Sequence, residues 1–319
     1  MRVIVYLPLI VSALLAVAGP WSAGRMPPRS ATRLLLATGL TCAVTSLVAL
    51  ALLAATLVGQ VPLVAAVGTW SGEVLRHYDP VSPVVAELAG AALVALGAAI
   101  TWTATRWVRA IRHVRRASRE LGGQGRLVVL DRPEPEAFAL PARRDEHGRI
   151  VVSAGMLRIL DAAERRVLLA HEAAHLRHRH HRHRSLAGLI AAANPLLATL
   201  PGAVHHLTER WADEEAAAAV ADRDLAARTL ARAALAAAAE DRRSPFDGAA
   251  PCFHRHGVPC RVRALLADAP PRRPLVALLL TVLLAGSLLS ALEAGHDADE
   301  LFDRAAGRGT GTHRMPSAR

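Results

Sequence analysis

Long apolar runs separated by charged segments dominate the pattern of this 319-residue chain. A helix needs about 20 mostly apolar residues to cross a bilayer. Four runs come near or exceed that length with little charge, at residues 3–19, 34–59, 84–105 and 274–292. The sequence therefore predicts a multi-span membrane protein, with a membrane region over residues 1–108 that holds three spans and a last span at 274–292.

A fifth apolar run, residues 185–204, is interrupted by Asn194, Pro195 and Pro201. Proline inside a helix removes a backbone hydrogen bond and kinks or ends the helix. We therefore expect a re-entrant or interfacial hairpin here, with a full span as the alternative.

The arginines predict the orientation in the membrane. The loop after the first run carries Arg25, Arg29 and Arg33 without an acid, and six more arginines lie within residues 106–119. Because basic loops stay in the cytoplasm, we expect the region that follows the third span to be cytoplasmic and both termini to be extracytoplasmic.

The first run allows a second interpretation. Residues 1–19 have one arginine, an apolar centre and a small-residue end, which is also typical of a cleaved signal peptide. Cleavage would place the first arginine-rich loop outside, against the positive-inside tendency. An uncleaved span agrees better with the charges, and the signal peptide stays an alternative.

Composition narrows the function classes. The chain is 52% hydrophobic and has only three cysteines, which excludes a disordered chain or a disulfide framework. A net charge of +11 would suit nucleic acid, but aromatic platforms for bases are scarce at 3% aromatic residues. We expect the lipid bilayer as a partner and no direct nucleic-acid binding.

Residues 109–273 read as a small α+β domain between the third and last spans. Short, partly β-branched runs at 127–130, 136–140 and 149–152 are typical of strands. A helix is expected from Asp161, because Glu164 stands at capping-box spacing. The predicted fold class is mainly α. After this domain come the last span, residues 274–292, and a short tail, residues 293–319.

The predicted helix carries the motif His171-Glu172-Ala173-Ala174-His175. Two histidines four apart lie on one helix face and can bind one Zn²⁺, and the glutamate beside them can act as general base. The neighbouring stretch RHRHHRHR over 177–184 is rich in histidine, so local composition by itself is the competing explanation.

A zinc site of this type needs a third protein ligand. Glu209 follows His175 by 34 residues, and Asp213 stands four residues further on one helix face. We expect Glu209 to bind the metal and Asp213 to accept a hydrogen bond from the far nitrogen of a ligand histidine. The alternative is that both are acids of a solvated helix face.

His181 is a rival third ligand, at the spacing of another zinc motif that needs a glycine turn three residues after the second histidine. His178 occupies that position. We therefore expect the helix to continue past it and His181 to point away from the metal.

Together these residues resemble the BlaR/MecR-type membrane gluzincin peptidases, with the HtpX and CAAX prenyl protease group as nearest relatives. The resemblance runs from Ala137 to Leu266 and includes the Ala137–Pro141 and Arg261–Leu266 segments. It implies a gluzincin-like protease domain and a regulatory role, such as cleavage of a paired transcriptional repressor. The extracellular penicillin-binding domain of the sensor members has no counterpart in residues 293–319.

Such peptidases also supply a residue that steadies the oxyanion. His256 is the first candidate, because it precedes the Arg261 segment much as a histidine does in the relatives; His205, His206 and His254 are alternatives. The spacing Cys252, His254, His256, Cys260 also allows a second metal site or a redox switch.

The sequence thus predicts a zinc-dependent integral-membrane endopeptidase acting on protein or peptide substrates. The alternative is a membrane signalling or scaffold protein that keeps the zinc-binding fold without turnover.

Overall fold

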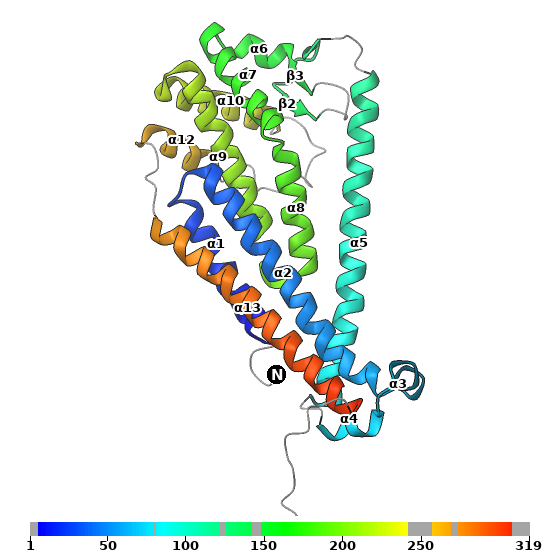
Figure 1. The fold of residues 1–319 in the computed structure, drawn as a ribbon. Helices are drawn as coiled ribbons and strands as arrows, with labels where there is room; N and C mark the ends of the chain where they lie inside the picture. The colour runs from blue at the N-terminus through cyan, green and yellow to red at the C-terminus, as the bar shows by residue number, and fades with distance from the viewer. Residues whose placement is uncertain are drawn as a thin grey trace, which may run out of the picture.

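The computed structural model describes residues 6–78, 81–120, 125–141, 148–241, 257–268 and 274–307. In chain order the elements are α1 (Leu7–Ala23), α2 (Pro28–Gly59), α3 (Pro62–Gly68), α4 (Gly72–Tyr78), α5 (Pro83–Glu120), β1 (Leu127–Leu130), β2 (Ala137–Leu140), β3 (Arg149–Ser153), α6 (Ala154–Ile159), α7 (Ala162–Arg177), α8 (His180–Ala193), η2 (Pro195–Leu197), α9 (Leu200–Val220), α10 (Arg223–Asp241), α12 (Val258–Leu266) and α13 (Pro274–Ala305). The fold is mainly helical with one small sheet, as the sequence predicts (Figure 1).

Three helices of the described residues are long and apolar enough to cross a membrane: Pro28–Gly59, Pro83–Val114 and Pro274–Ala305. Each has 32 residues and is therefore about 48 Å long, which exceeds the hydrocarbon core of a bilayer. They contain the predicted runs at 34–59, 84–105 and 274–292, so the chain is a multi-pass membrane protein. The apolar helix α1 is shorter, with 17 residues, and a span over 3–19 stays a prediction.

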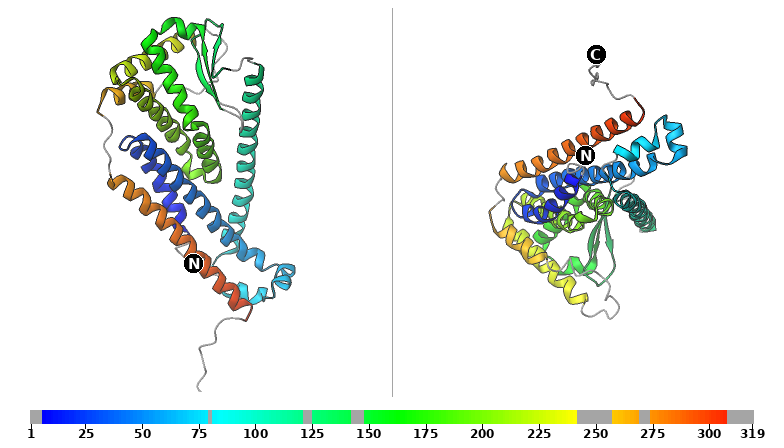
Figure 2. Two further views of the ribbon diagram at one scale, coloured as in Figure 1. Left: turned by 45° about the horizontal axis from the view of Figure 1, so that its top comes forward. Right: turned by 90° about the horizontal axis from the view of Figure 1, so that it is seen from below.

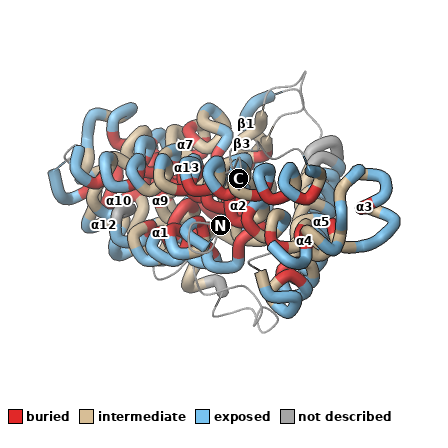
Figure 3. Tube along the Cα trace, turned by 60° about the horizontal axis from the view of Figure 1, so that its bottom comes forward, coloured by how far each residue is buried: buried red, intermediate tan, exposed pale blue. Residues whose placement is uncertain are grey.

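Burial follows the bundle. Buried residues lie on the inside of the bundle (Figure 3), where α1, α2 and α13 share one apolar core with α8 and α9. On the outside, Val94, Leu275 and Leu292 are among the apolar side chains that stay exposed. Apolar surface of this extent on long helices fits contact with lipid.

The segment 185–204 folds back as a hairpin. Asn194 ends α8, its Oδ1 accepts a hydrogen bond from the Leu196 backbone N–H at 3.2 Å, and Pro195 opens the 3-10 turn η2. The tip packs among the membrane helices, because Asn194 Nδ2 donates to Ser12 Oγ at 2.8 Å and to Ser46 Oγ at 3.2 Å. Proline therefore breaks the helix as expected, and the depth of the hairpin in a bilayer stays a prediction.

The sheet has the order β1-β3-β2, with β1 parallel and β2 antiparallel to β3. All three predicted strands are confirmed within a residue of their limits. The central strand β3 buries Val151 and Val152, whereas β2 is an edge strand beside the upper end of α5 (Figure 2, left). After β3 the backbone passes so close to Pro133 that a Cβ on Gly155 would lie 1.9 Å from the Pro133 carbonyl oxygen, so this position requires glycine.

Helix α7 begins where the sequence predicts. Asp161 Oδ1 accepts hydrogen bonds of 2.8 Å from the Ala163 and Glu164 backbone N–H groups, and the Asp161 N–H donates to Glu164 Oε2 at 2.9 Å. This capping box fixes the start of the helix, and the motif histidines follow in its third and fourth turns. Helix α7 packs against α9, and this brings His171 and His175 opposite Glu209 and Asp213.

Candidate metal centre

The two motif histidines lie one above the other on α7. His171 Nε2 and His175 Nε2 are 3.1 Å apart. Burial, and after it the charge of His171, lowers the pKa of His175 to about 3, so its imidazole is neutral and offers a lone pair. The i, i+4 spacing on one helix thus makes a two-nitrogen site.

Glu209 on α9 completes the group. Its Oε2 lies 3.8 Å from His171 Nε2 and its Oε1 lies 3.4 Å from His175 Nε2. Ligand atoms about 2.0–2.1 Å from a tetrahedral Zn²⁺ stand about 3.3 Å from one another. The two histidine nitrogens are close to that separation, and one oxygen of Glu209 faces each of them within 3.8 Å. The residues fit the ion: within the described part of the chain, the predicted ligands His171, His175 and Glu209 come together as a group that could hold a metal ion.

Asp213 lies one turn after Glu209, with Oδ1 3.1 Å from His171 Nδ1. Burial by itself would raise the pKa of Asp213, but hydrogen bonds from Arg261 and His171 lower it below its ordinary value. The side chain is therefore an ionised acceptor that faces the nitrogen of His171 directed away from the metal group.

Two arginines that no sequence motif indicates form ion pairs with Glu209 and Asp213. Arg261 on α12 contacts Glu209 Oε2 through Nη1 at 2.7 Å and also holds Asp213. Arg184 on α8 donates to Glu209 Oε1 at 2.5 Å and to Thr208 Oγ1 at 3.0 Å. These charges outweigh burial and hold the pKa of Glu209 well below its ordinary value. A local pattern offers no signal for such pairs, because their partners lie 25 to 52 residues apart.

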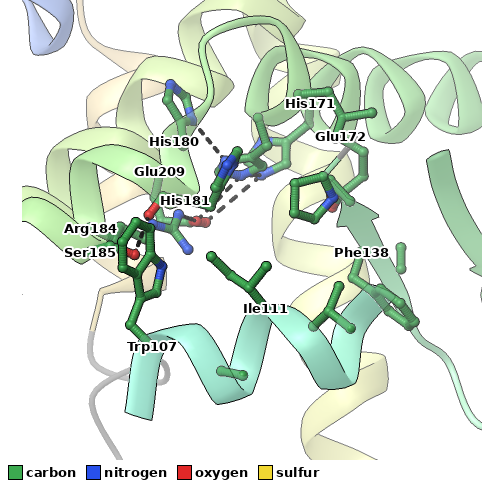
Figure 4. Close-up of a pocket in the computed structure, with 17 residues that line it drawn as sticks. Trp107, Ile111, Phe138, His171, Glu172, His180, His181, Arg184, Ser185 and Glu209 are labelled. Atoms are coloured by element: carbon green, nitrogen blue, oxygen red, sulfur yellow. Dashed lines mark hydrogen bonds and ion pairs between the residues drawn. The ribbon is translucent and has the colours of Figure 1, made fainter. Parts of the chain in front are cut away.

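A cavity of about 600 Å³ opens onto the group (Figure 4). Helix α5 forms one wall with Trp107, Ala110, Ile111 and Val114, and strand β2 forms another with Phe138. Glu172, 8% exposed, lines the cavity beside the two histidines. Burial raises the pKa of Glu172 above its ordinary value.

The expected continuation of the helix past His178 is wrong. Helix α7 ends at Arg177, and Arg179 takes a left-handed conformation with φ 52° before α8 begins at His180. The chain therefore turns without a glycine, because a single non-glycine residue can occupy this region at modest cost. His181 then lines the cavity but does not belong to the metal-binding group.

The remaining predicted candidates fall elsewhere. His256 lies outside the described residues, as do Cys252 and His254, whereas Cys260 is exposed on α12. The alternatives His205 and His206 lie on α9 and are not among the residues that line the cavity.

The segment around the two histidines is similar to a known peptidase family. Residues 103–205 match the model of Peptidase family M48. M48 peptidases depend on zinc, and the matched segment contains His171 and His175 but ends four residues before Glu209, which the fold brings to them. The segment that carries both histidines is therefore similar to peptidases of family M48.

Relatives named Protease HtpX homolog agree with this match. Those of Burkholderia thailandensis, Burkholderia mallei and Burkholderia pseudomallei are each 36% identical over 77 residues, which is 24% of this chain and 26% of the relative. The chain thus covers about a quarter of the length of the curated relatives it matches. No solved structure matches. The comparison agrees with the HtpX group named from the motifs, and the BlaR/MecR type stays a prediction.

Proposed function

We propose that this chain is a zinc-dependent integral-membrane endopeptidase that hydrolyses peptide bonds of protein substrates. The observation that carries the proposal is the convergence of His171, His175 and Glu209 at one end of a cavity that Glu172 also lines. Bound zinc would polarise the carbonyl of the scissile bond and lower the pKa of water. Three protein ligands leave a tetrahedral ion one position for solvent or substrate.

Glu172 is the proposed general base. Its carboxylate takes a proton from the attacking water and later delivers it to the leaving amine. Burial raises the pKa of this side chain, which makes the carboxylate a stronger base toward the attacking water.

Asp213 is the proposed orienting partner of His171. Asp213 would accept a hydrogen bond from the Nδ1–H of His171, which leaves the Nε2 lone pair for the metal. Arg261 holds the Asp213 carboxylate in place. His256 stays the proposed oxyanion-steadying residue on the resemblance alone.

The substrate is proposed to bind as an extended segment between β2 and α5. An edge strand offers unpaired backbone groups to an incoming strand, and β2 lines the cavity through Ala137, Phe138 and Ala139. The opposite wall is the end of a candidate membrane span, residues 83–114. These two walls favour protein segments with apolar side chains near the membrane surface.

The orientation is proposed from charge. Arg25 lies just before α2 and Arg29 and Arg33 lie in its first two turns, whereas the arginines of residues 106–119 lie toward the end of α5. The positive-inside tendency places these ends, and with them the domain of residues 109–273, in the cytoplasm, with both termini outside. A paired transcriptional repressor would then be accessible, and cleavage of one remains the regulatory hypothesis that the BlaR/MecR resemblance implies.

The deciding experiment compares purified wild-type protein with Glu172→Gln. Wild type should cleave unfolded protein substrates only when zinc is bound, and Glu172→Gln should keep its zinc content but lose at least about a thousandfold in kcat, because general base catalysis and water activation are both affected. Glu215→Gln, on α9 and paired with Arg177, is the matched control that should keep activity. If wild-type protein binds zinc but shows no cleavage that Glu172→Gln abolishes, the scaffold alternative replaces the enzyme.

A further inference from the structure

The second motif histidine has a partner that the mechanism above does not use. His180 is 1% exposed, and its Nδ1 lies 2.7 Å from Nδ1 of His175. The turn at Arg179 makes this contact, because it brings the first residue of α8 back to the end of α7. Figure 4 shows the His180 ring above and to the left of the metal group, joined to it by a dashed line.

The metal group decides which nitrogen carries the hydrogen. His175 faces His171 and Glu209 with Nε2, so Nε2 is the atom it offers to a metal. A neutral imidazole with a lone pair on Nε2 carries its hydrogen on Nδ1. That N–H must donate to His180 Nδ1, since the reverse arrangement would protonate Nε2 of His175 and remove the ligand lone pair.

The surroundings keep His180 an acceptor. Its ring packs against Trp211, with centroids 4.9 Å apart, and beside His178 at 5.8 Å. The ring is almost fully buried among these aromatic side chains, where a charged imidazolium without a counter-charge would be costly. Its other nitrogen, Nε2, is buried without a hydrogen-bond partner among the described residues. A buried N–H without a hydrogen-bond partner lowers the stability of the fold. If residue 180 only filled space, an apolar side chain would therefore be more stable there than histidine.

We propose that His180 is a positioning residue that holds His175 in its metal-binding tautomer, as Asp213 does for His171. The proposal rests on the metal centre of the proposed function, but not on proteolysis. The two ligand histidines would then have different hydrogen-bond acceptors: the Asp213 carboxylate for His171 and the neutral His180 imidazole for His175. Outer partners of this kind typically change metal affinity by 10- to 100-fold when they are removed.

The test measures zinc affinity of the full-length protein in detergent by competition with a chelating dye. His180→Leu and His180→Phe remove the acceptor and keep an apolar filling, so each should weaken zinc binding by about 10- to 100-fold. The thermal midpoint of the zinc-free protein should not fall, because the unpaired buried N–H is also removed. A purely structural role predicts the opposite: a lower midpoint with zinc affinity unchanged in the folded fraction.

His180→Asn is the rescue variant. Asparagine Oδ1 stands at the same distance along its side chain as histidine Nδ1, so it can accept from His175 and should restore most of the zinc affinity. His183→Leu is the matched control, because His183 also packs near Trp211, at 5.9 Å, and its Nδ1 is likewise buried and unpaired among the described residues. It should bind zinc like wild type.

The same variants loaded with Co²⁺ give a second readout, since a rotated ligand changes the visible absorption bands of the bound ion. Wild-type affinity in both apolar variants would overturn the proposal, as would an asparagine variant as weak as the leucine variant. Failure of proteolysis in wild type would leave these affinities unchanged, so the two proposals fail separately.

Discussion

Arg261 holds Asp213 through two hydrogen bonds of 2.7 Å, from Nε to Oδ2 and from Nη2 to Oδ1. The guanidinium is 11% exposed, and its third nitrogen contacts Glu209. One buried cation thus ties α12 to the two acids of α9, one a metal ligand and the other the partner of His171. Planar recognition of this kind is specific to arginine.

Removing that cation should affect both folding and metal binding. Arg261→Gln leaves two buried carboxylates without their main counter-charge, and breaking a buried pair costs roughly 3–5 kcal/mol. We expect a lower thermal midpoint and weaker zinc binding, measured on the same detergent-purified sample. Arg223→Gln is the control, because Arg223 also pairs with an acid of α9, Glu214, away from the metal group. Equal effects of the two substitutions would show that Arg261 contributes only an ordinary ion pair.

The ligand set can be checked by metal analysis. His171→Ala, His175→Ala and Glu209→Gln should each lower the zinc content of the purified protein, because each removes one of the three ligand atoms. His181→Ala should retain full zinc, since His181 lines the cavity outside the group. Loss of zinc in His181→Ala would contradict the assignment of Glu209 as third ligand.

The wall that α5 contributes should set substrate preference. Ile111→Asn places a polar side chain in the apolar wall and should raise KM for apolar peptides on the order of 10-fold, with kcat changed less. Arg112→Gln, next along the same helix but not lining the cavity, is the control. Steady-state kinetics on peptides with leucine or serine at successive positions would locate the affected subsite; an unchanged KM would remove α5 from the binding site.

The cap of α7 predicts a pH dependence of stability. Hydrogen bonding from the Glu164 backbone N–H, opposed by burial, lowers the pKa of Asp161 below its ordinary value of 3.8. A carboxylate whose pKa is lowered on folding stabilises the fold above its unfolded pKa, and this is lost as the pH falls through the folded pKa. The thermal midpoint of wild type should therefore fall below about pH 4 more than that of Asp161→Asn, which caps without titrating. Parallel pH curves for the two proteins would contradict this role of the cap.

Reporter fusions test the orientation. A reporter placed after residue 120 should report the cytoplasm, and one at the C-terminus should report the outside, because a single predicted span, 274–292, separates them. Reports from the same side would mean that α13 does not cross or that the 185–204 hairpin does.

Local sequence patterns by themselves predicted the long apolar helices, the start of α7 and the pair of metal-binding histidines. Apolar runs of 20 or more residues mark α2 and α5, and capping-box spacing marks the start of α7. The His171–His175 pair follows from helical periodicity alone, since residues four apart share a face in any helix. Glu209 could be proposed because the chemistry of zinc requires a third ligand, and Glu209 shares a predicted helix face with Asp213, four residues later.

Tertiary structure alone decided what surrounds the metal group. The turn at Arg179 has no glycine to announce it, so the sequence pointed to a continuous helix and concealed that His180 returns to His175. Arg261 reaches Asp213 across 48 residues, and α5 reaches the cavity from a membrane span. Such contacts depend on which faces the whole bundle buries together, whereas sequence periodicity reports only the face that each helix offers.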